Sequence, residues 1–325
     1  LSFLDPEQTK YLAMFIDLIM NSKNYEEGIN VLKSMNAEFG DSPDRLAQLG
    51  LLMYRAGQKE EALGLLEIAI EATPENPNYY FPLFDLYMDE NNHEKASKVA
   101  DKLVSNFPED WRGYYSRSLV YMNDKQPEKV IMILEPVSDT FNKIFSIQYL
   151  LGLSHNQLKQ FDIAQKYFSK ALTIRPDSPN VLHSMAILYD EVNAWEKSDE
   201  IYLRLIETDS TDAQAFNNFA YSLVERNQEL KKALSLAKKA IELEPENASY
   251  LDTIGWIYFK LDNPKKAQAY IESSININGE NAIVLEHLGD VLMKIQKSDD
   301  AIDYYKRALS LDKNNPRLMK KVSPE

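Results

Sequence analysis

The sequence predicts an all-α protein built as an array of one repeated pair of helices, and three observations support this. Small or apolar residues recur every 34 residues, so that Gly255 is followed by Gly289 and Ala267 by Ala301. Within each period, apolar residues are spaced i, i+3, i+4 and i+7, as on one face of a helix. Proline closes several periods, where it prevents a helix from continuing. A fixed period of this length is typical of stacked helical arrays.

Two positions, the eighth and the twentieth residue of each unit, trace the repeat along the chain. Every step is 34 residues except one of 35, which places a single inserted residue within 225–232. The eighth positions are Ile16, Gly50, Phe84, Ser118, Gly152, Ala186, Ala220, Gly255 and Gly289. The twentieth positions are Gly28, Ala62, Ala96, Val130, Ala164, Ser198, Ala233, Ala267 and Ala301. A single array over residues 1–325 is therefore predicted, with nine units starting near Thr9, Pro43, Pro77, Trp111, Phe145, Pro179, Ala213, Ala248 and Ala282.

Each unit is predicted to contain two antiparallel helices joined by a short polar turn. In the unit 248–281, the first helix has its apolar face at Leu251, Ile254 and Tyr258. Pro264 follows in the turn, and proline is favoured in the first turn of a new helix. A turn of this length leaves only an antiparallel arrangement of the two helices.

The two helices of a unit are expected to approach most closely at the eighth and twentieth positions, because small residues gather there. Where the eighth position is the large Ile16, the twentieth is Gly28. Phe84 is opposite Ala96 and has no such compensation, so we expect the third unit to have its helices further apart or rotated.

Residues 316–325 restart the pattern, since Pro316 matches Pro43 and Pro77. This segment is predicted to be a short capping helix or the beginning of a truncated tenth unit. We favour a truncated or frayed end.

Composition excludes several function classes. The chain of 325 residues has no cysteine, so disulfides, thiol catalysis and Cys-ligated zinc are excluded. The net charge is −14, and residues 1–110 alone carry 20 acidic and 9 basic side chains, a balance of −11. This charge argues against nucleic-acid binding, which depends on Lys and Arg. No apolar run is long enough for a membrane span, and the choice between cytoplasm and periplasm stays open.

The pattern resembles the tetratricopeptide repeat over residues 9–315. The small residues of that family at places 8, 20 and 27 of a unit recur here as Gly50, Ala62 and Ala69, its aromatic at place 11 as Tyr87, and its proline at place 32 as Pro74. The C-terminal units are also similar to repeats common in bacterial members. The resemblance implies a right-handed superhelical solenoid of antiparallel helix pairs that acts as a protein-binding scaffold.

The resemblance also implies a concave groove lined by the first helices of successive units. The candidate peptide-binding residues there are Tyr54, Phe81, Tyr115, Tyr149, Asn217, Asn218, Tyr221, Asp252, Trp256, Phe259, Glu286 and Asp290. An Asn side chain can hydrogen-bond both the N–H and the C=O of an extended peptide. A variant of the family clamps a carboxylate with Lys at place 5, but no unit has Lys there, so such a clamp is not expected.

Chemistry other than binding finds little support in the sequence. No catalytic motif, cofactor motif or metal site is recognised. Glu286, His287 and Asp290 form the best candidate cluster, which could hold a cation or a Lys or Arg side chain, but an exposed acidic helix face is the favoured interpretation. The leading hypothesis is a non-enzymatic scaffold for a protein or peptide segment, neutral or basic. The alternative is a structural array that assembles through its ends or convex face. Partner and oligomeric state are not predicted.

Overall fold

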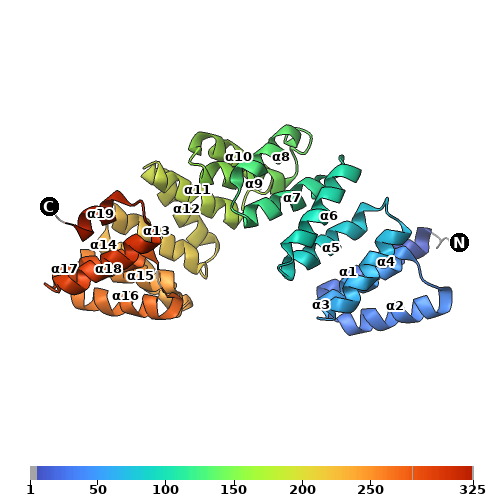
Figure 1. Ribbon diagram of the computed structural model, residues 1–325, viewed down its shortest axis with the longest axis horizontal. Helices are drawn as coiled ribbons and strands as arrows, with labels where there is room; N and C mark the ends of the chain where they lie inside the picture. Colours follow the sequence, from blue (N-terminus) through green and yellow to red (C-terminus); the bar gives the residue numbers. More distant parts are fainter. Residues whose placement is uncertain (1–5, 280, 324–325) are drawn as a thin grey trace. The chain divides into compact units, whose positions relative to one another are not determined.

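A computed structural model describes residues 6–279 and 281–323, and within these ranges every regular element is helical. Helices that follow one another in the chain pack together in pairs, which confirms the predicted all-α class. The chain divides into two compact units, residues 1–176 and 177–325 (Figure 1). The first unit and the second unit are these two parts, and each 34-residue period inside them is a repeat.

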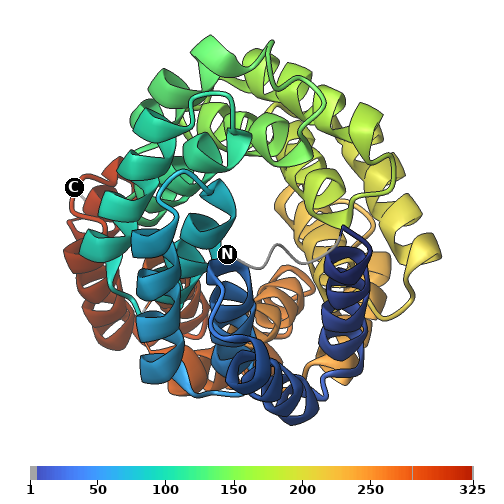
Figure 2. The same cartoon turned by 90° about the vertical axis from the view of Figure 1, so that its right-hand side faces the viewer.

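The first unit can be followed from blue to green in Figure 2. Its helices are α1 (Pro6–Ser22), α2 (Tyr25–Phe39), α3 (Pro43–Arg55), α4 (Lys59–Ala72), α5 (Pro77–Asp89), α6 (His93–Asn106), α7 (Trp111–Asn123), α8 (Pro127–Leu134), the 3₁₀ turn η1 (Glu135–Val137), α9 (Phe145–Gln157) and α10 (Phe161–Ile174). The helix α8 is short because Pro136 follows its last turn and cannot continue it.

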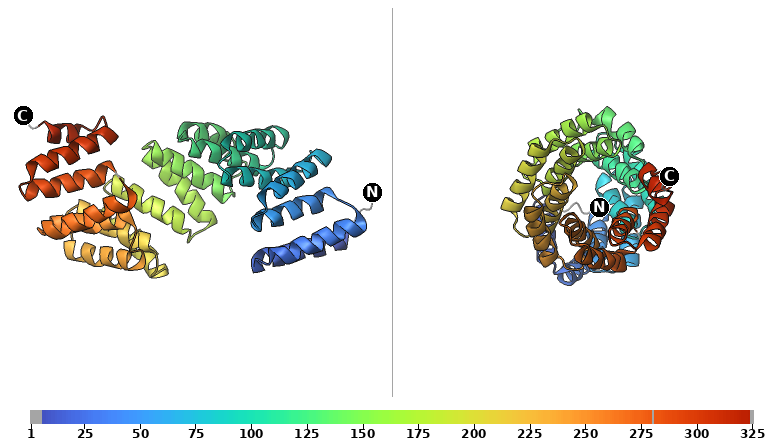
Figure 3. Two further views of the ribbon diagram at one scale, coloured as in Figure 1. Left: turned by 60° about the horizontal axis from the view of Figure 1, so that its bottom comes forward. Right: turned by 90° about the vertical axis from the view of Figure 1, so that its left-hand side faces the viewer.

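The second unit continues the same alternation of first and second helices (Figure 3). Its helices are α11 (Pro179–Glu191), α12 (Trp195–Thr208), α13 (Ala213–Glu225), α14 (Leu230–Leu243), α15 (Ala248–Lys260), α16 (Pro264–Asn278), α17 (Ala282–Lys294), α18 (Ser298–Leu311) and α19 (Pro316–Val322). That the two units belong to one array over residues 1–325 stays a prediction.

The turn inside each helix pair uses one residue in the left-handed region. These residues are Lys23, Gly57, Asn91, Lys125, Lys159, Asn193, Asn227, Asp262 and Gln296. The turn between α13 and α14 has a second one, Glu229, with φ 43°. The inserted residue of the 35-residue repeat therefore lies in this turn, inside the predicted range 225–232.

The glycines at the eighth positions let the two helices of a pair meet. A Cβ atom on Gly50 would lie 3.1 Å from the carbonyl oxygen of Ala62, and one on Gly255 would lie 3.2 Å from that of Ala267. The same atoms would meet Leu66 and Ile271, sixteen residues further along the chain. The eighth position is thus kept small by the backbone at place 20 and by the side chain at place 24.

Place 24 also explains the large Phe84. A Cβ on Gly152 would meet Phe168, and one on Gly289 would meet Tyr305, so a glycine is matched by a large ring. For Phe84 the residue at place 24 is Ala100, and both are fully buried. The size of Phe84 is therefore matched at place 24 and not at place 20, and α5 and α6 pack together less extensively than α3 and α4, in line with the expectation for the third repeat.

The neighbours of Gly28 also differ from the expectation. A Cβ there would lie 2.6 Å from Leu52 and 2.9 Å from Ile19, and Ile16 is not among the nearest groups. The helix α3 of the next pair therefore helps to keep this position small.

The restart of the pattern at Pro316 produces the helix α19, which packs on α18 and fully buries Leu318. Of the end that was expected to fray, residues 324–325 lie outside the described part of the chain.

Candidate binding surface

First helices of neighbouring pairs touch one another within each unit. In the first unit, α5 contacts both α3 and α7, and α7 contacts α9; in the second unit, α13 contacts α11 and α15, and α15 contacts α17. We call the side that these helices share the first-helix face. The twelve candidate residues all belong to first helices, and the two units differ in the kind of residue that these helices carry.

The first unit places aromatic side chains there. Tyr54, Phe81, Tyr115 and Tyr149 are all half-buried. The ring centroids of Phe81 and Tyr115 lie 6.3 Å apart although α5 and α7 are separate helices. Trp111 lies 5.7 Å from Tyr115, within the range of favourable aromatic pairs. We call the rings of Tyr54, Phe81, Tyr115 and Tyr149 the aromatic row.

Tyr149 extends the aromatic character of this unit on α9. Its ring lies 5.8 Å from that of Phe145 in a stacked arrangement and 6.1 Å from that of Phe168. The guanidinium of Arg175 lies 4.4 Å from the Phe145 ring. Half-buried rings of this kind offer a large contact area at low cost in conformational entropy.

Asp85 lies one helical turn after Phe81 on α5, close enough to Tyr115 of α7 for its charge to act on that hydroxyl. Its carboxyl group is half-buried, and burial raises its pKa above the usual value, an effect that the charge of Arg55 opposes. Burial, and then the charge of Asp85, raise the pKa of the Tyr115 hydroxyl. Asp85 was not among the twelve candidate residues, although it lies at a place that the resemblance assigns to the groove. The sequence feature that distinguishes Asp85 is a carboxylate at the place where the two neighbouring repeats have Leu51 and Leu119.

The second unit places polar residues on its face, beginning with two asparagines. Asn217 is 6% exposed, and its Nδ2 donates a 3.3 Å hydrogen bond to Oδ1 of the half-buried Asn218. No hydrogen bond reaches Oδ1 of Asn217 from the described residues. Tyr221 is half-buried, and burial, followed by the charge of Glu225, raises its pKa to about 12.

Trp256 joins three first helices. Its ring is 7% exposed, stacks at 4.0 Å on His287 of α17, and stacks at 4.8 Å on the half-buried Phe259. Its Nε1 donates a 2.9 Å hydrogen bond to Glu225 of α13. The indole therefore packs between helix pairs, which leaves little of it for a ligand.

The three candidate carboxylates of this unit are already paired inside the chain. Asp252 lies 3.0 Å from Nδ1 of His287, and both side chains are buried. Glu286 is 3% exposed and pairs with Lys321 at 2.7 Å. The interpretation of Glu286 and His287 as an exposed acidic face is thus wrong, because α17 turns them toward α15 and α19.

The helix α19 supplies the cations for this cluster. Arg317 lies 2.8 Å from Glu286, and Lys321 lies 2.5 Å from Asp290. Asp290 also accepts a 2.7 Å hydrogen bond from the hydroxyl of Tyr305. The expected affinity of this cluster for Lys and Arg is therefore satisfied by residues of the chain itself.

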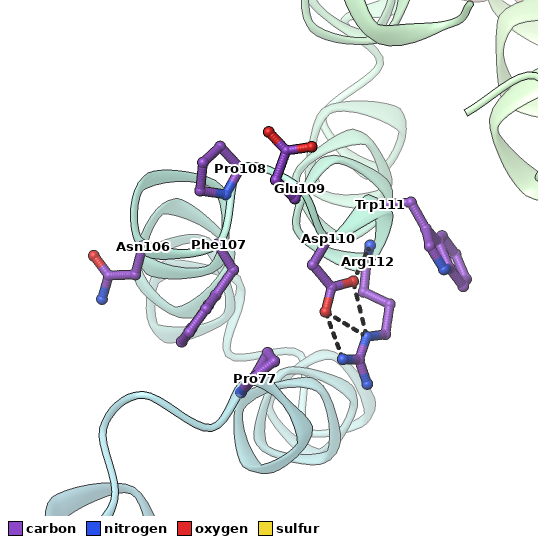
Figure 4. A pocket seen from close by; sticks show the side chains of 8 residues that line it. All are labelled: Pro77, Asn106, Phe107, Pro108, Glu109, Asp110, Trp111 and Arg112. Carbon is purple, nitrogen blue, oxygen red and sulfur yellow. Dashed lines mark hydrogen bonds and ion pairs between the residues drawn. The ribbon is translucent and has the colours of Figure 1, made fainter. Parts of the chain in front are cut away.

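An open hollow of 710 Å³ lies beside the turn between α6 and α7 in the first unit (Figure 4). Phe107 and Pro77 face each other across it, while Trp111 points away. Its one guanidinium, Arg112, is held by Asp110 and donates a 2.8 Å hydrogen bond to Asn78. The polar groups here stabilise the turn and are not directed toward a ligand.

Within 6–279 and 281–323, no three His, Asp or Glu side chains gather closely enough to hold a metal ion. No helix in these ranges is long and apolar enough to cross a membrane.

Comparisons with known proteins place this arrangement in a family. Models of the tetratricopeptide repeat match residues 153–321 and 20–81. The human cell division cycle protein 16 homolog is 26% identical over 121 residues, which are 35% of this chain and 20% of that protein. The TPR repeat-containing protein MJ1428 of Methanocaldococcus jannaschii is 25% identical over 170 residues, which are 50% of this chain and 30% of that protein. The chain thus spans less than a third of the length of these relatives.

A solved structure shows the same fold. The crystal structure of the APC/C hetero-tetramer Cut9-Hcn1 matches with a TM-score of 0.65 at 13% identity, covering 91% of this chain and 58% of that chain. The first family model alone spans more than half of the sequence. The consecutive helix pairs, the small residues at their contacts and this match together show that the chain belongs to the tetratricopeptide repeat family.

Proposed function

We propose that the chain is a non-enzymatic interaction module that holds a segment of a partner protein on its first-helix face. The observation that carries this proposal is the aromatic row, because Phe81 and Tyr115 are half-buried on successive first helices without being absorbed into the core. Large rings at partly exposed positions supply most of the binding energy at protein interfaces. The solved structure of similar fold, Cut9-Hcn1, is itself an assembly of proteins.

The two units have different roles in this proposal. In the first unit, the residues proposed to contact a ligand are Tyr54, Phe81, Tyr115 and Tyr149; in the second unit, considered by itself, they are Asn218 and Tyr221. Asn217, Asp252, Trp256 and Glu286 are more deeply buried and hold the neighbouring helices in register. Phe259 and Asp290, both half-buried, border this face.

The preferred ligand is neutral or basic. Residues 1–110 carry a net charge of −11, which repels acidic segments within about 10 Å at ordinary ionic strength. Nucleic acid is disfavoured for the same reason.

Site-specific photocrosslinking tests the proposal. A photoreactive phenylalanine analogue in place of Tyr115 or Tyr149 is compared with the same analogue in place of Ile163, which is 38% exposed on the second helix α10. In cells that make the chain, we expect the two first-helix positions to crosslink to a common partner and Ile163 not to do so. Equal crosslinking from all three positions would remove the first-helix face as the binding surface.

A second candidate function is self-association, which one observation favours. Tyr11, Met14 and Leu18 form a stripe along α1 and are 63%, 58% and 64% exposed. Apolar stripes of this kind often mark interaction sites. If the array assembles through this helix, the mass measured by light scattering will rise with concentration, and Leu18→Glu will abolish the rise.

A further inference from the structure

We propose that Asp85 and the rings around it form a subsite for a cationic side chain, a Lys ammonium or an Arg guanidinium, on the segment bound by the first-helix face. The Asp85 subsite consists of Tyr54, Phe81, Asp85 and Tyr115. The inference rests on the proposed function, to which it adds the chemistry of one ligand group.

The position of Asp85 is costly for a carboxylate. It lies on α5, which contacts the first helices α3 and α7 of the neighbouring pairs. The same place in the two neighbouring repeats holds Leu51 and Leu119, both half-buried. Burying a charged group without a partner is unfavourable, so an apolar residue here would stabilise the array better.

Asp85 also lacks the partners that other carboxylates on the first-helix face have. Asp190 accepts hydrogen bonds from Tyr202 at 2.9 Å and from Ser222 at 2.8 Å. Asp252 and Glu286 are paired with His287 and Lys321. Among the described residues, none forms a hydrogen bond or an ion pair with Asp85. Its carboxylate therefore keeps its capacity to accept hydrogen bonds.

The nearest cation of the chain is Arg55, and it is directed elsewhere. Its side chain is exposed, and its guanidinium lies 5.5 Å from the ring centroid of Tyr54. Its charge reaches Asp85 through space, since it opposes the rise in the pKa of that carboxyl, but the two side chains form no ion pair. A ligand cation at Asp85 would thus compete with Arg55 for the field of one carboxylate.

The surrounding rings favour a cation as the occupant. Phe81 is one turn from Asp85 on α5, and Tyr115 is 6.3 Å from Phe81. Aromatic faces attract ammonium and guanidinium groups, more strongly where water is partly excluded. The net charge of −11 on residues 1–110 adds a field of the same sign. The carboxylate, the rings and the field therefore select the same ligand chemistry.

The test uses a phage library of random dodecapeptides panned against the whole chain. We expect the enriched peptides to share a Lys or Arg among apolar residues. A synthetic peptide of the enriched sequence should bind Asp85→Asn about tenfold more weakly, as for loss of a partly buried charge pair. Asp89→Asn, on the exposed end of the same helix, is the matched control and should leave the affinity unchanged. Arg55→Gln should strengthen binding.

A change in the peptide completes the cycle. Replacing its basic residue by the neutral isostere citrulline, or by norleucine for Lys, should weaken binding to the native chain and have little further effect on Asp85→Asn. Circular dichroism melting curves establish that each variant is folded.

The outcomes separate the subsite from the proposed function. Enriched peptides without basic residues, or equal losses for Asp85→Asn and Asp89→Asn, overturn the subsite. Peptides that need Phe81 and Tyr115 but not Asp85 remove the subsite and leave the proposed function standing. If no peptide is enriched, or if enriched peptides bind Phe81→Ala and Tyr115→Ala unchanged, both proposals fail.

Discussion

At the scale of single residues, the side chains at places 8 and 24 of a repeat share one space between its two helices. Gly152 lies against Phe168, and Gly289 against Tyr305, whereas Phe84 is matched by Ala100. In these three pairs, a large side chain on one helix is matched by a small residue on the other. Cores tolerate such exchanges when volume and pattern are kept.

A swap tests this complementarity. Ala100→Phe alone should destabilise the chain by about 1–3 kcal/mol through overpacking. Adding Phe84→Gly should recover much of this loss, because the ring then occupies the space that Phe168 fills opposite Gly152. Urea unfolding of the two single variants and the double variant gives the coupling energy. Additive losses would show that the two positions do not share this space.

Gly113 provides a second residue-scale prediction. A Cβ there would lie 2.9 Å from backbone atoms of Leu103 and Val104, which cannot move away as a side chain can. Gly113→Ala should therefore cost about 1–3 kcal/mol. Gly64, in the helix α4, has nothing within 4 Å of its would-be Cβ. Gly64→Ala is the control and should stabilise by about 0.5–1 kcal/mol through helix propensity; a loss at both positions would contradict the packing argument.

Asp85 gives a prediction with a defined pH dependence. Burial raises the pKa of its carboxyl above 3.8 in the folded chain. Between the unfolded and the folded pKa, the native state binds more protons, so stability falls as pH rises. Asp85→Asn removes this effect and should be more stable than the native chain at pH 7, with the difference vanishing on the acid side of 3.8. Chemical denaturation across this range makes the comparison, and a variant less stable at neutral pH would show that the carboxylate has a stabilising partner.

The sequence predicted which residues belong to first helices but not how deeply each is buried. Trp256 and Asp252 are buried because His287, which contacts both, is supplied by the next pair. Those contacts depend on how side chains of neighbouring repeats meet, and an alignment of the repeats does not contain that information. Glu286 was mistaken for a solvated residue for the same reason, since its cations lie 31 and 35 residues further along the chain.

At the scale of helices, the pairing was predictable because period, turn length and proline position agree. The short α8 shows the limit of that reasoning, since the repeat indicates a full second helix where Pro136 ends it early. Placement of the inserted residue succeeded because a change of period confines it to the turn between α13 and α14.

The helix α19 gives a prediction at this scale. Lys321 pairs with the buried Glu286 and with Asp290, whereas Lys320 is exposed. Lys321→Ala should destabilise the packing of α19 on α18 by about 1–3 kcal/mol, because Glu286 then keeps only Arg317 as a cation. Lys320→Ala should change stability by less than about 0.5 kcal/mol. Hydrogen exchange at the amide of Leu318 measures both, and equal effects would show that the ion pairs contribute nothing to α19.

At the scale of the whole molecule, each pair depends on its neighbours, so stability varies along the chain. The region 77–176 contains the short α8 and the turn η1, where the second helix of its pair is interrupted. We therefore expect amides in 179–315 to exchange more slowly than those in 77–176. Native-state hydrogen exchange followed by mass spectrometry tests this, and uniform protection would contradict it.

The contacts that define this chain fall into two classes with different consequences for its evolution. Pairs such as Gly255 and Ile271 lie inside one repeat, so duplication or loss of a repeat leaves them intact. Pairs such as Asp252 and His287 join two neighbouring repeats. Loss of the repeat 248–281 would bring His287 next to the repeat that contains Asn217, which offers an amide in place of the carboxylate. Loss or gain of a repeat in the C-terminal region would thus change which charged groups meet at the new junction.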